Sequence, residues 1–232
     1  MSTPTQEQLE EYGSKSEELL PKILELQNNS DWKEAKKDND VIIYTRSDPS
    51  SHYNQVKAVS IIPSPIDKIV DHLKVLEPID SQTPKEKRHL ITERKILYGP
   101  LEDKYQSTIF MYELDIPAPL VSPRDYVLFR RHYQPSESQH VFLHNSIVSE
   151  LCPERKGAVR GEIMFQCYVV EPDPSNQENC RLTFLIHSDP KGKMSPSFYN
   201  MALPNQGYAA SRIKKQMLFF LHHFLNFTGH ST

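Results

Sequence analysis

Three ionisable residues lie within or beside segments rich in apolar and aromatic side chains. Arg130 directly follows the run from Tyr126 to Phe129, while Glu113 and His187 each adjoin a similar segment. An arginine on the inner side of such a segment needs a carboxylate, water or a bound polar group, because burying an unpaired charge costs roughly several kcal/mol. Glu113 and His187 are the residues that could act as a general acid or base on a buried substrate.

Other catalytic patterns are weak or missing. His187, Ser188 and Asp189 contain the residue types of a hydrolytic triad, but neighbours on one strand point to opposite faces and cannot form its geometry. His222 and His223 are adjacent on an expected helix, which does not suit chelation of one ion. With no phosphate-binding loop or dinucleotide motif either, we expect no metal, no cofactor and no enzymatic activity.

The balance of charges argues against a nucleic-acid partner. The 232 residues include 27 Lys and Arg against 30 Asp and Glu, which gives a net charge of −3. Nucleic-acid binding normally needs an excess of basic residues. The length and even composition suit one domain over 1–232, with a core at 17–217 and an apolar extension at 218–232.

The cysteines and apolar segments favour a cytoplasmic protein. The three cysteines are odd in number and lack metal-ligand spacing, and the first residues are too polar for a signal peptide. The most apolar run, 217–221, is much shorter than the roughly 20 residues of a membrane span. We therefore expect a monomer that does not cross a membrane, with peripheral membrane contact left open.

Hydrophobic periodicity predicts strands framed by helices. Helices are expected over 17–28 and after Ser64, and strands over 41–46, 53–62, 90–97, 105–114, 126–133, 140–149, 159–170 and 181–188. From 195 onward, apolar residues recur every three to four positions, as in a long amphipathic helix. Pro204 and Gly207 lie inside this helix and should kink it.

Several short strings, in their order along the chain, resemble the START family, the steroidogenic-acute-regulatory-protein-related lipid transfer domains. The most specific is the segment 121–127, Val-Ser-Pro-Arg-Asp-Tyr-Val, which with Arg130 looks like the family's PRDF/Y turn and cavity arginine. The other matching strings are Trp32 and the segments 40–46, 157–162, 188–192 and 195–200.

The resemblance implies an α+β helix-grip fold, in which a curved antiparallel sheet of about nine strands wraps around a long C-terminal helix and encloses a lipid tunnel. It also implies a gate between the loop 116–122 and the C-terminal helix. The expected gate residues are Pro119, Leu120, Val121, Pro204 and Gly207.

Residues on the face of Arg130 should line this tunnel, because strand side chains alternate between faces. The expected lining from the strands is Ile109, Met111, Glu113, Tyr126, Leu128, Arg130, Ile163, Phe165 and His187, with Cys167 and Leu185 as further candidates. The expected lining from the C-terminal helix is Phe198, Met201, Ala202 and Ala209.

The partner of Arg130 stays open at the level of sequence. Met111 occupies the position at which sterol carriers of the resembled family place an acidic residue, and Glu113 lies two residues further on. Glu113 could pair with Arg130 across the sheet. The alternative is an anionic or phosphate headgroup, which suits the planar guanidinium. The choline-binding residues of phosphatidylcholine carriers are not matched near 75–81.

The resemblance therefore predicts intracellular binding and transfer of one lipid, a phospholipid or a sterol, with transient contact to a membrane surface. Two alternatives remain. Lipid occupancy could change the exposure of the apolar segment 218–227 and so control a partner protein. Less favoured is an enzyme of the wider superfamily, with Glu113 or His187 as its general acid or base.

Overall fold

The computed structural model describes residues 3–85, 90–116 and 121–228. The helices are α1 (Gln6–Asn28), α2 (Ile66–Lys74), α4 (Pro196–Ala202), the 3-10 turn η1 (Leu203–Gly207) and α5 (Tyr208–Thr228). The strands are β1 (Lys33–Asp38), β2 (Val41–Arg46), β3 (Gln55–Ile62), β4 (Ile91–Tyr98), β5 (Thr108–Leu114), β6 (Arg124–Ser136), β7 (Gln139–Ser146), β8 (Val159–Arg160), β9 (Glu162–Asp173) and β10 (Asn176–Asp189).

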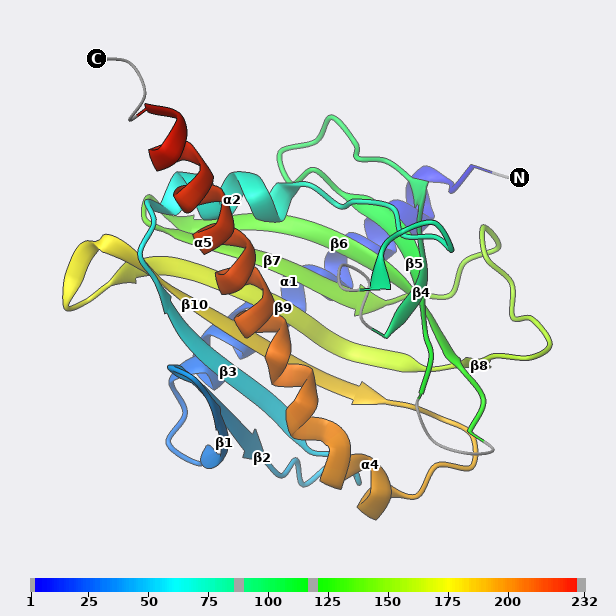
Figure 1. Cartoon of the computed structure of the whole chain (residues 1–232). Coiled ribbons are helices and arrows are strands. Elements are labelled where there is room, and N and C mark those ends of the chain that lie inside the picture. The colour runs from blue at the N-terminus through cyan, green and yellow to red at the C-terminus, as the bar shows by residue number, and fades with distance from the viewer. Residues whose placement is uncertain (1–2, 86–89, 117–120, 229–232) are drawn as a thin grey trace.

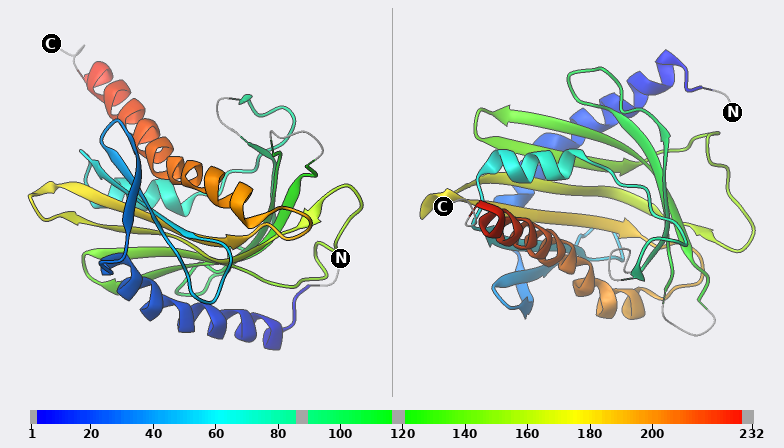
Figure 2. Two further views of the ribbon diagram at one scale, coloured as in Figure 1. Left: turned by 90° about the horizontal axis from the view of Figure 1, so that it is seen from below. Right: turned by 45° about the horizontal axis from the view of Figure 1, so that its top comes forward.

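The strands form one open sheet in the order β1-β2-β3-β10-β9-β7-β6-β5-β4, and β8 pairs with β6 outside this path. All neighbours along the path are antiparallel. The sheet curves around α5, which crosses one face, here called the inner face (Figure 1). Helix α1 covers the opposite, outer face (Figure 2). The predicted helix-grip fold is therefore confirmed.

Helix α1 begins well before the predicted start at residue 17. Thr5 and Gln8 form a capping box, in which the Thr5 hydroxyl accepts from the Gln8 amide at 3.2 Å and the Gln8 side chain accepts from the Thr5 amide at 2.9 Å. This cap satisfies amides that would otherwise lack partners. Pro21 lies inside the helix and marks neither end. Periodicity missed the first turns because they are polar.

Strand β1 was not expected from the sequence, because its composition, Lys-Glu-Ala-Lys-Lys-Asp, is almost wholly charged. It pairs with β2 at the edge of the sheet and is largely exposed. Lysines on an edge strand discourage pairing with other chains. Backbone pairing with an apolar neighbour therefore outweighs the weak strand propensity of these residues.

The predicted break in the C-terminal helix is confirmed, since η1 separates α4 from α5 and contains both Pro204 and Gly207. Gly207 lies against Ile43 of β2, where an added Cβ atom would come within 2.7 Å of the isoleucine Cγ2. The absence of a side chain thus lets the helical segment pack closely on the sheet. Among the described residues, no helix has the length and apolarity to cross a bilayer.

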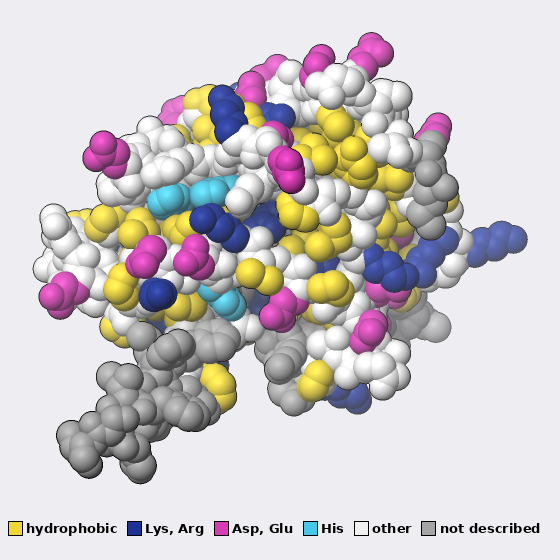
Figure 3. Space-filling view, turned by 90° about the horizontal axis from the view of Figure 1, so that it is seen from above, with side chains coloured by type: hydrophobic (Ala, Val, Ile, Leu, Met, Phe, Trp, Pro, Cys, Tyr) yellow, Lys and Arg dark blue, Asp and Glu magenta, His cyan; other side chains and the backbone are white. Residues whose placement is uncertain are grey.

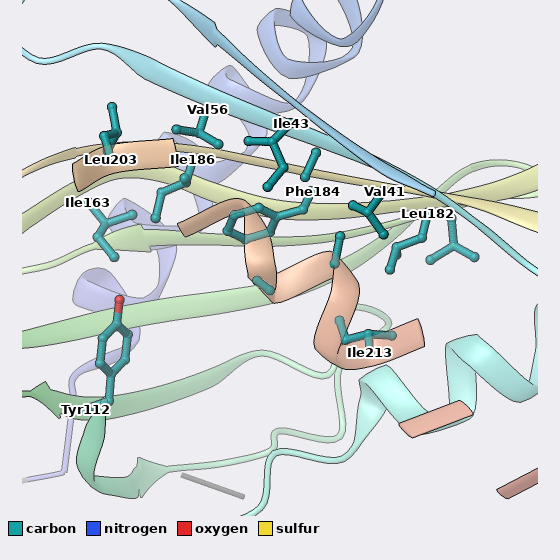
Figure 4. Close-up of a cluster of buried hydrophobic side chains, with 14 of the residues drawn as sticks. Val41, Ile43, Val56, Tyr112, Ile163, Leu182, Phe184, Ile186, Leu203 and Ile213 are labelled. Atoms are coloured by element: carbon teal, nitrogen blue, oxygen red, sulfur yellow. The ribbon is translucent and has the colours of Figure 1, made fainter. Parts of the chain in front are cut away.

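Apolar side chains pack on both faces of the sheet. The inner cluster lies between the sheet and α5 and includes Ile43, Val56, Tyr112, Tyr126, Leu128, Ile163, Phe184, Ile186, Ala209 and Ile213. Figure 4 shows strand side chains of this cluster directed toward α5, and Ile213 of α5 packs among them. Two outer clusters pack against α1 through Ile23 and Tyr12. The two-sided burial explains why several strands are apolar at almost every position.

Candidate functional site

Strand β6 presents Tyr126, Leu128 and Arg130 to the inner face. Tyr126 and Leu128 belong to the inner cluster, whereas Val127 and Phe129 pack with α1 on the outer face. This alternation agrees with the face predicted from the sequence. The part of these residues in lipid binding stays a prediction.

On the neighbouring strand β5, the predicted lining residues lie on the wrong face. Phe110 pairs with Leu128 and Tyr112 pairs with Tyr126, so the inner residues are the aromatic ones. Ile109 and Met111 instead pack on the outer face beside α1. Their prediction is wrong because a shift of one residue in register moves every side chain to the other face. The buried, apolar sequence of β5 does not indicate which register is correct.

Glu113 does not pair with Arg130. It lies opposite Asp125, and its carboxylate accepts a hydrogen bond from Thr92 Oγ1 at 2.8 Å and from the guanidinium of Arg155. The predicted pair is therefore wrong, and so is the place of Glu113 in the lining. Arg155 is distant in sequence from Glu113, so only the fold reveals the pair.

On strand β9, two further residues that were predicted to line the tunnel lie on the outer face. Ile163 packs in the inner cluster, as predicted, but Phe165 and Cys167 pack in the outer cluster. A register irregularity against β10 falls between the pairs of Ile163 and Phe165. An extra residue at such a bulge reverses the alternation of side chains beyond it. Simple alternation from Ile163 therefore fails after two positions.

His187 and Leu185 also lie away from the inner face. Leu185 belongs to the outer cluster, and the His187 ring packs against Phe165. His187 Nε2 lies 3.1 Å from the carbonyl oxygen of Tyr53, and its Nδ1 lies 3.6 Å from Asp48 Oδ2. Burial lowers the pKa of His187, although Asp48 acts in the opposite direction. Both predicted positions are wrong, again because β10 was assigned the opposite alternation.

The C-terminal helical segment supplies fewer lining residues than expected. Ala209 is buried in the inner cluster, but Phe198 and Met201 are 39% and 74% exposed, and Ala202 is exposed too. The buried residue of α4 is Tyr199, whose hydroxyl lies 2.6 Å from Ser188 Oγ. The break at η1 ends the continuous helical stripe on which the prediction depended.

The predicted gate lies only partly within the described residues. Pro119 and Leu120 fall outside them. Val121 packs beside the inner cluster, Pro204 is half-buried and Gly207 is buried against β2. Their action as a gate stays a prediction.

Arg130 binds the end of a helix. It is 7% exposed, and its Nη1 donates to the carbonyl oxygen of Lys74 at 3.1 Å, while Nη2 donates to that of Leu73. These carbonyls end α2, where the helix dipole favours a positive charge. The guanidinium carbon lies 5.3 Å from the centre of the Phe142 ring. Burial lowers the pKa of Arg130 to about 10, and Arg94 adds to this effect.

Sequence reasoning missed other polar residues near Arg130. Arg94 on β4 lies opposite Tyr112, and His144 on β7 lies opposite Arg130. Arg212 lies on α5, three residues after the buried Ala209. That spacing was a usable signal for Arg212, since residues three apart share a helix face.

Comparisons with known proteins agree with this architecture. A family model described as the START domain matches residues 12–231. No curated protein sequence is significantly similar to the chain. Several solved structures are similar in fold at low identity, including two human proteins and one from Xanthomonas axonopodis.

The structural similarity extends over most of each chain. Human StAR-related lipid transfer protein 5 matches with a TM-score of 0.75 and 17% identity, covering 92% of this chain and 99% of that one. Human STARD10 matches with a TM-score of 0.65 and 16% identity, covering 99% and 86%. The STAR-related lipid transfer protein of Xanthomonas axonopodis matches with a TM-score of 0.64 and 17% identity, covering 81% and 99%. At these identities the similarity concerns the fold.

Proposed function

Because this chain belongs to the START domain family, whose members bind or transfer lipids, we propose that it carries one lipid between the inner face of its sheet and α5. The carrier works in the cytoplasm as a monomer and meets a membrane only transiently. Apolar chains lie among the inner-cluster residues, and each methylene removed from water contributes about 0.8 kcal/mol. A bilayer offers the chains an equivalent environment, so the lipid can leave there.

One observation carries this proposal: the inner face combines apolar side chains with buried polar groups that lack protein partners. The hydroxyls of Tyr112 and Tyr126 form no hydrogen bond with another described residue, although both side chains are buried. Figure 4 shows Tyr112 directed from β5 toward Ile163. On the same face, both ring nitrogens of His144 are buried without a hydrogen-bond partner. Buried polar groups normally have partners, so this ring and the two hydroxyls are suited to contact a ligand's polar end.

Release of the lipid requires α5 to move away from the sheet. Lys214 of α5 pairs with Asp40, in the turn between β1 and β2. Asn200 of α4 accepts a hydrogen bond from the amide of Asn54 at 2.9 Å and donates to the carbonyl of His52 at 3.0 Å. These polar contacts hold one side of the helical segment, and His72 of α2 contacts Gln216 of α5 at 3.1 Å. The exposed Phe198 and Met201 lie in the same segment and are suited to enter a membrane surface.

A reversible cross-link tests this motion. Asp40→Cys and Lys214→Cys, in a chain carrying Cys152→Ser, are joined by a short disulfide-containing bifunctional reagent. Transfer of a fluorescent lipid between donor and acceptor vesicles should fall by about tenfold and recover when the cross-link is reduced. The single Lys214→Cys variant, treated identically, controls for the effect of attaching the reagent without joining α5 to the sheet. Undiminished transfer by the cross-linked protein would contradict opening at α5.

The other candidate functions have less support. The enzyme hypothesis needed a general acid or base at the interior, but its two candidates, Glu113 and His187, lie away from the inner face and contact Arg155 and Tyr53. The sensor hypothesis concerns the segment 218–227, of which only the side chains of 218 and 219 are described. Leu218 and Phe219 are exposed, which keeps this hypothesis as a prediction.

A further inference from the structure

Three arginines from distant parts of the chain lie around one tyrosine beneath α5. Arg94, Arg130 and Arg212 are all close enough to Tyr168 of β9 for their charges to act against the effect of burial on its pKa. The Tyr168 ring lies 6.3 Å from that of His144, which is the direct cross-strand neighbour of Arg130. β4, β6 and α5 thus direct positive charge into one region of the interior.

These charges are poorly compensated by the protein. Arg130 donates to the two carbonyls at the end of α2, and Arg94 Nη1 donates to the carbonyl oxygen of Glu77 at 3.2 Å. Arg212 forms no hydrogen bond or ion pair with another described residue. Within the described ranges, no carboxylate forms a salt bridge with any of the three.

The arginines also repel one another. Burial lowers the pKa of Arg94, and the charge of Arg212 lowers it further, whereas Tyr168, Tyr112 and the exposed Glu77 act in the opposite direction. Burial likewise lowers the pKa of Arg212. Like charges held together away from water are unfavourable unless an anion lies between them.

His144 is an independent observation that points to a polar ligand. Its side chain is 6% exposed, and neither Nδ1 nor Nε2 has a hydrogen-bond partner. Burial lowers its pKa well below the ordinary value, and Arg130 and Arg94 add to this, so the ring is neutral at physiological pH. A neutral imidazole still has one N–H to donate. Buried polar groups normally have hydrogen-bond partners, so both nitrogens of this ring can interact with a polar group of a ligand.

We infer that Arg94, Arg130, Arg212 and His144 receive the phosphate of a lipid whose headgroup carries a net negative charge. This inference deepens the proposed lipid-carrier function and rests on it. Several guanidinium groups suit the many acceptor oxygens of a phosphate. A choline or ethanolamine headgroup would add a cation to a region that already holds three, so zwitterionic lipids should bind less well.

The position of Arg212 links binding to closure. Arg94 and Arg130 belong to the sheet, whereas Arg212 belongs to α5. A bound phosphate therefore attracts the helix to the sheet, because it offsets the repulsion between these arginines. Figure 3 views the molecule from the side of α2, and there basic, acidic and hydrophobic side chains are interspersed across the middle of the face.

A competition experiment tests the inference on the full chain. The protein is incubated with sedimentable vesicles that contain phosphatidic acid and phosphatidylcholine in equal amounts, at about 0.15 M salt to screen surface charge. After the vesicles are removed, mass spectrometry measures the lipid that stays with the protein. We expect phosphatidic acid to exceed phosphatidylcholine by at least about tenfold.

Substitutions of the arginines test whether these residues cause the preference for phosphatidic acid over phosphatidylcholine. Arg94→Gln and Arg212→Gln should each reduce the preference by about tenfold without reducing phosphatidylcholine uptake, and Arg212→Lys should retain part of it. Lys215→Gln changes the charge of α5 equally at an exposed position and should keep the full preference. If a variant unfolds, the preference of the unchanged protein is itself decisive.

The other outcomes separate the two hypotheses. Equal uptake of both lipids, unaffected by Arg212→Gln, would overturn the anionic headgroup and leave the carrier function standing. Uptake of neither phospholipid would overturn the anionic headgroup, and failure to transfer any phospholipid or sterol between vesicles would overturn the carrier function as well. Inorganic phosphate or glycerol 3-phosphate that competes as tightly as phosphatidic acid would show that the site serves free phosphate compounds.

Discussion

Arg124 and Asp125, adjacent in the turn that opens β6, form polar contacts that tie distant segments together. Arg124 Nε donates to the carbonyl oxygen of Pro190 at 3.0 Å, and its Nη2 donates to that of Lys191 at 3.2 Å. Asp125 accepts two hydrogen bonds from Arg160, each of 3.0 Å. The most specific string in the sequence therefore fixes the fold, while Arg130, five residues after Asp125, faces the interior.

Breaking the pair of Asp125 and Arg160 should destabilise the protein strongly. Asp125 is almost completely buried, so Arg160→Gln would leave its carboxylate without a counter-charge. Loss of one partner of a buried pair costs about 3–5 kcal/mol. Urea denaturation measures the free energy of unfolding. Arg155→Gln, which breaks the more exposed pair with Glu113, is the matched control and should cost about 1 kcal/mol or less. Equal losses of unfolding free energy in the two variants would contradict the conclusion that the pair of Asp125 and Arg160 is the more buried one.

At the scale of elements, register and close approach decide which side chains meet. The pairing of β5 with β6 places Phe110 and Tyr112 on the inner face, and the irregularity in β9 sends Phe165 to the outer one. The C-terminal segment depends on close contact in the same way, because Gly207 leaves space for Ile43. An anionic lipid bound between β4 and α5 would add a further attraction between the helix and the sheet.

Gly207→Ala tests this contact. The new Cβ atom would lie 2.7 Å from Ile43 Cγ2, and Ile43 is fully buried and branched at Cβ, so it cannot turn away easily. We expect a loss of about 1–3 kcal/mol in the free energy of unfolding. In a double-mutant cycle, Ile43→Ala should cost less in the Gly207→Ala background than alone. A rise in melting temperature on Gly207→Ala would show that the contact is looser than described.

At the scale of the whole molecule, several histidines are held neutral by burial. The rings of His132 and His140 stack, with His132 Nε2 at 3.0 Å from His140 Nδ1. Burial lowers the pKa of His132 to about 4 and also lowers that of His140. Burial lowers the pKa values of His144 and His187 too. In each case, unfolding exposes a ring that binds a proton more readily.

The protein should therefore lose stability on acidification. An unfolded histidine has a pKa of about 6.5, so below that pH the unfolded chain binds more protons than the folded one. For His132, stability is complete above about pH 6.5 and is lost progressively toward its folded pKa of about 4. Urea midpoints should fall between pH 7 and pH 5. His132→Phe, which keeps the stack on Phe142, should make this fall shallower, and an unchanged slope would exclude His132 as a contributor.

The sequence by itself determined the helix-grip architecture, the break at Pro204 and Gly207, and the inner face of β6. Hydrophobic periodicity and helix-breaking residues are local properties, and the turn at 121–127 identified the family. The tertiary structure alone decided the partner of Arg130 and the faces of β5, β9 and β10. Those strands are apolar on both sides, so alternation gives no preferred register, and Arg94 and Arg212 join Arg130 only when the sheet curves around α5.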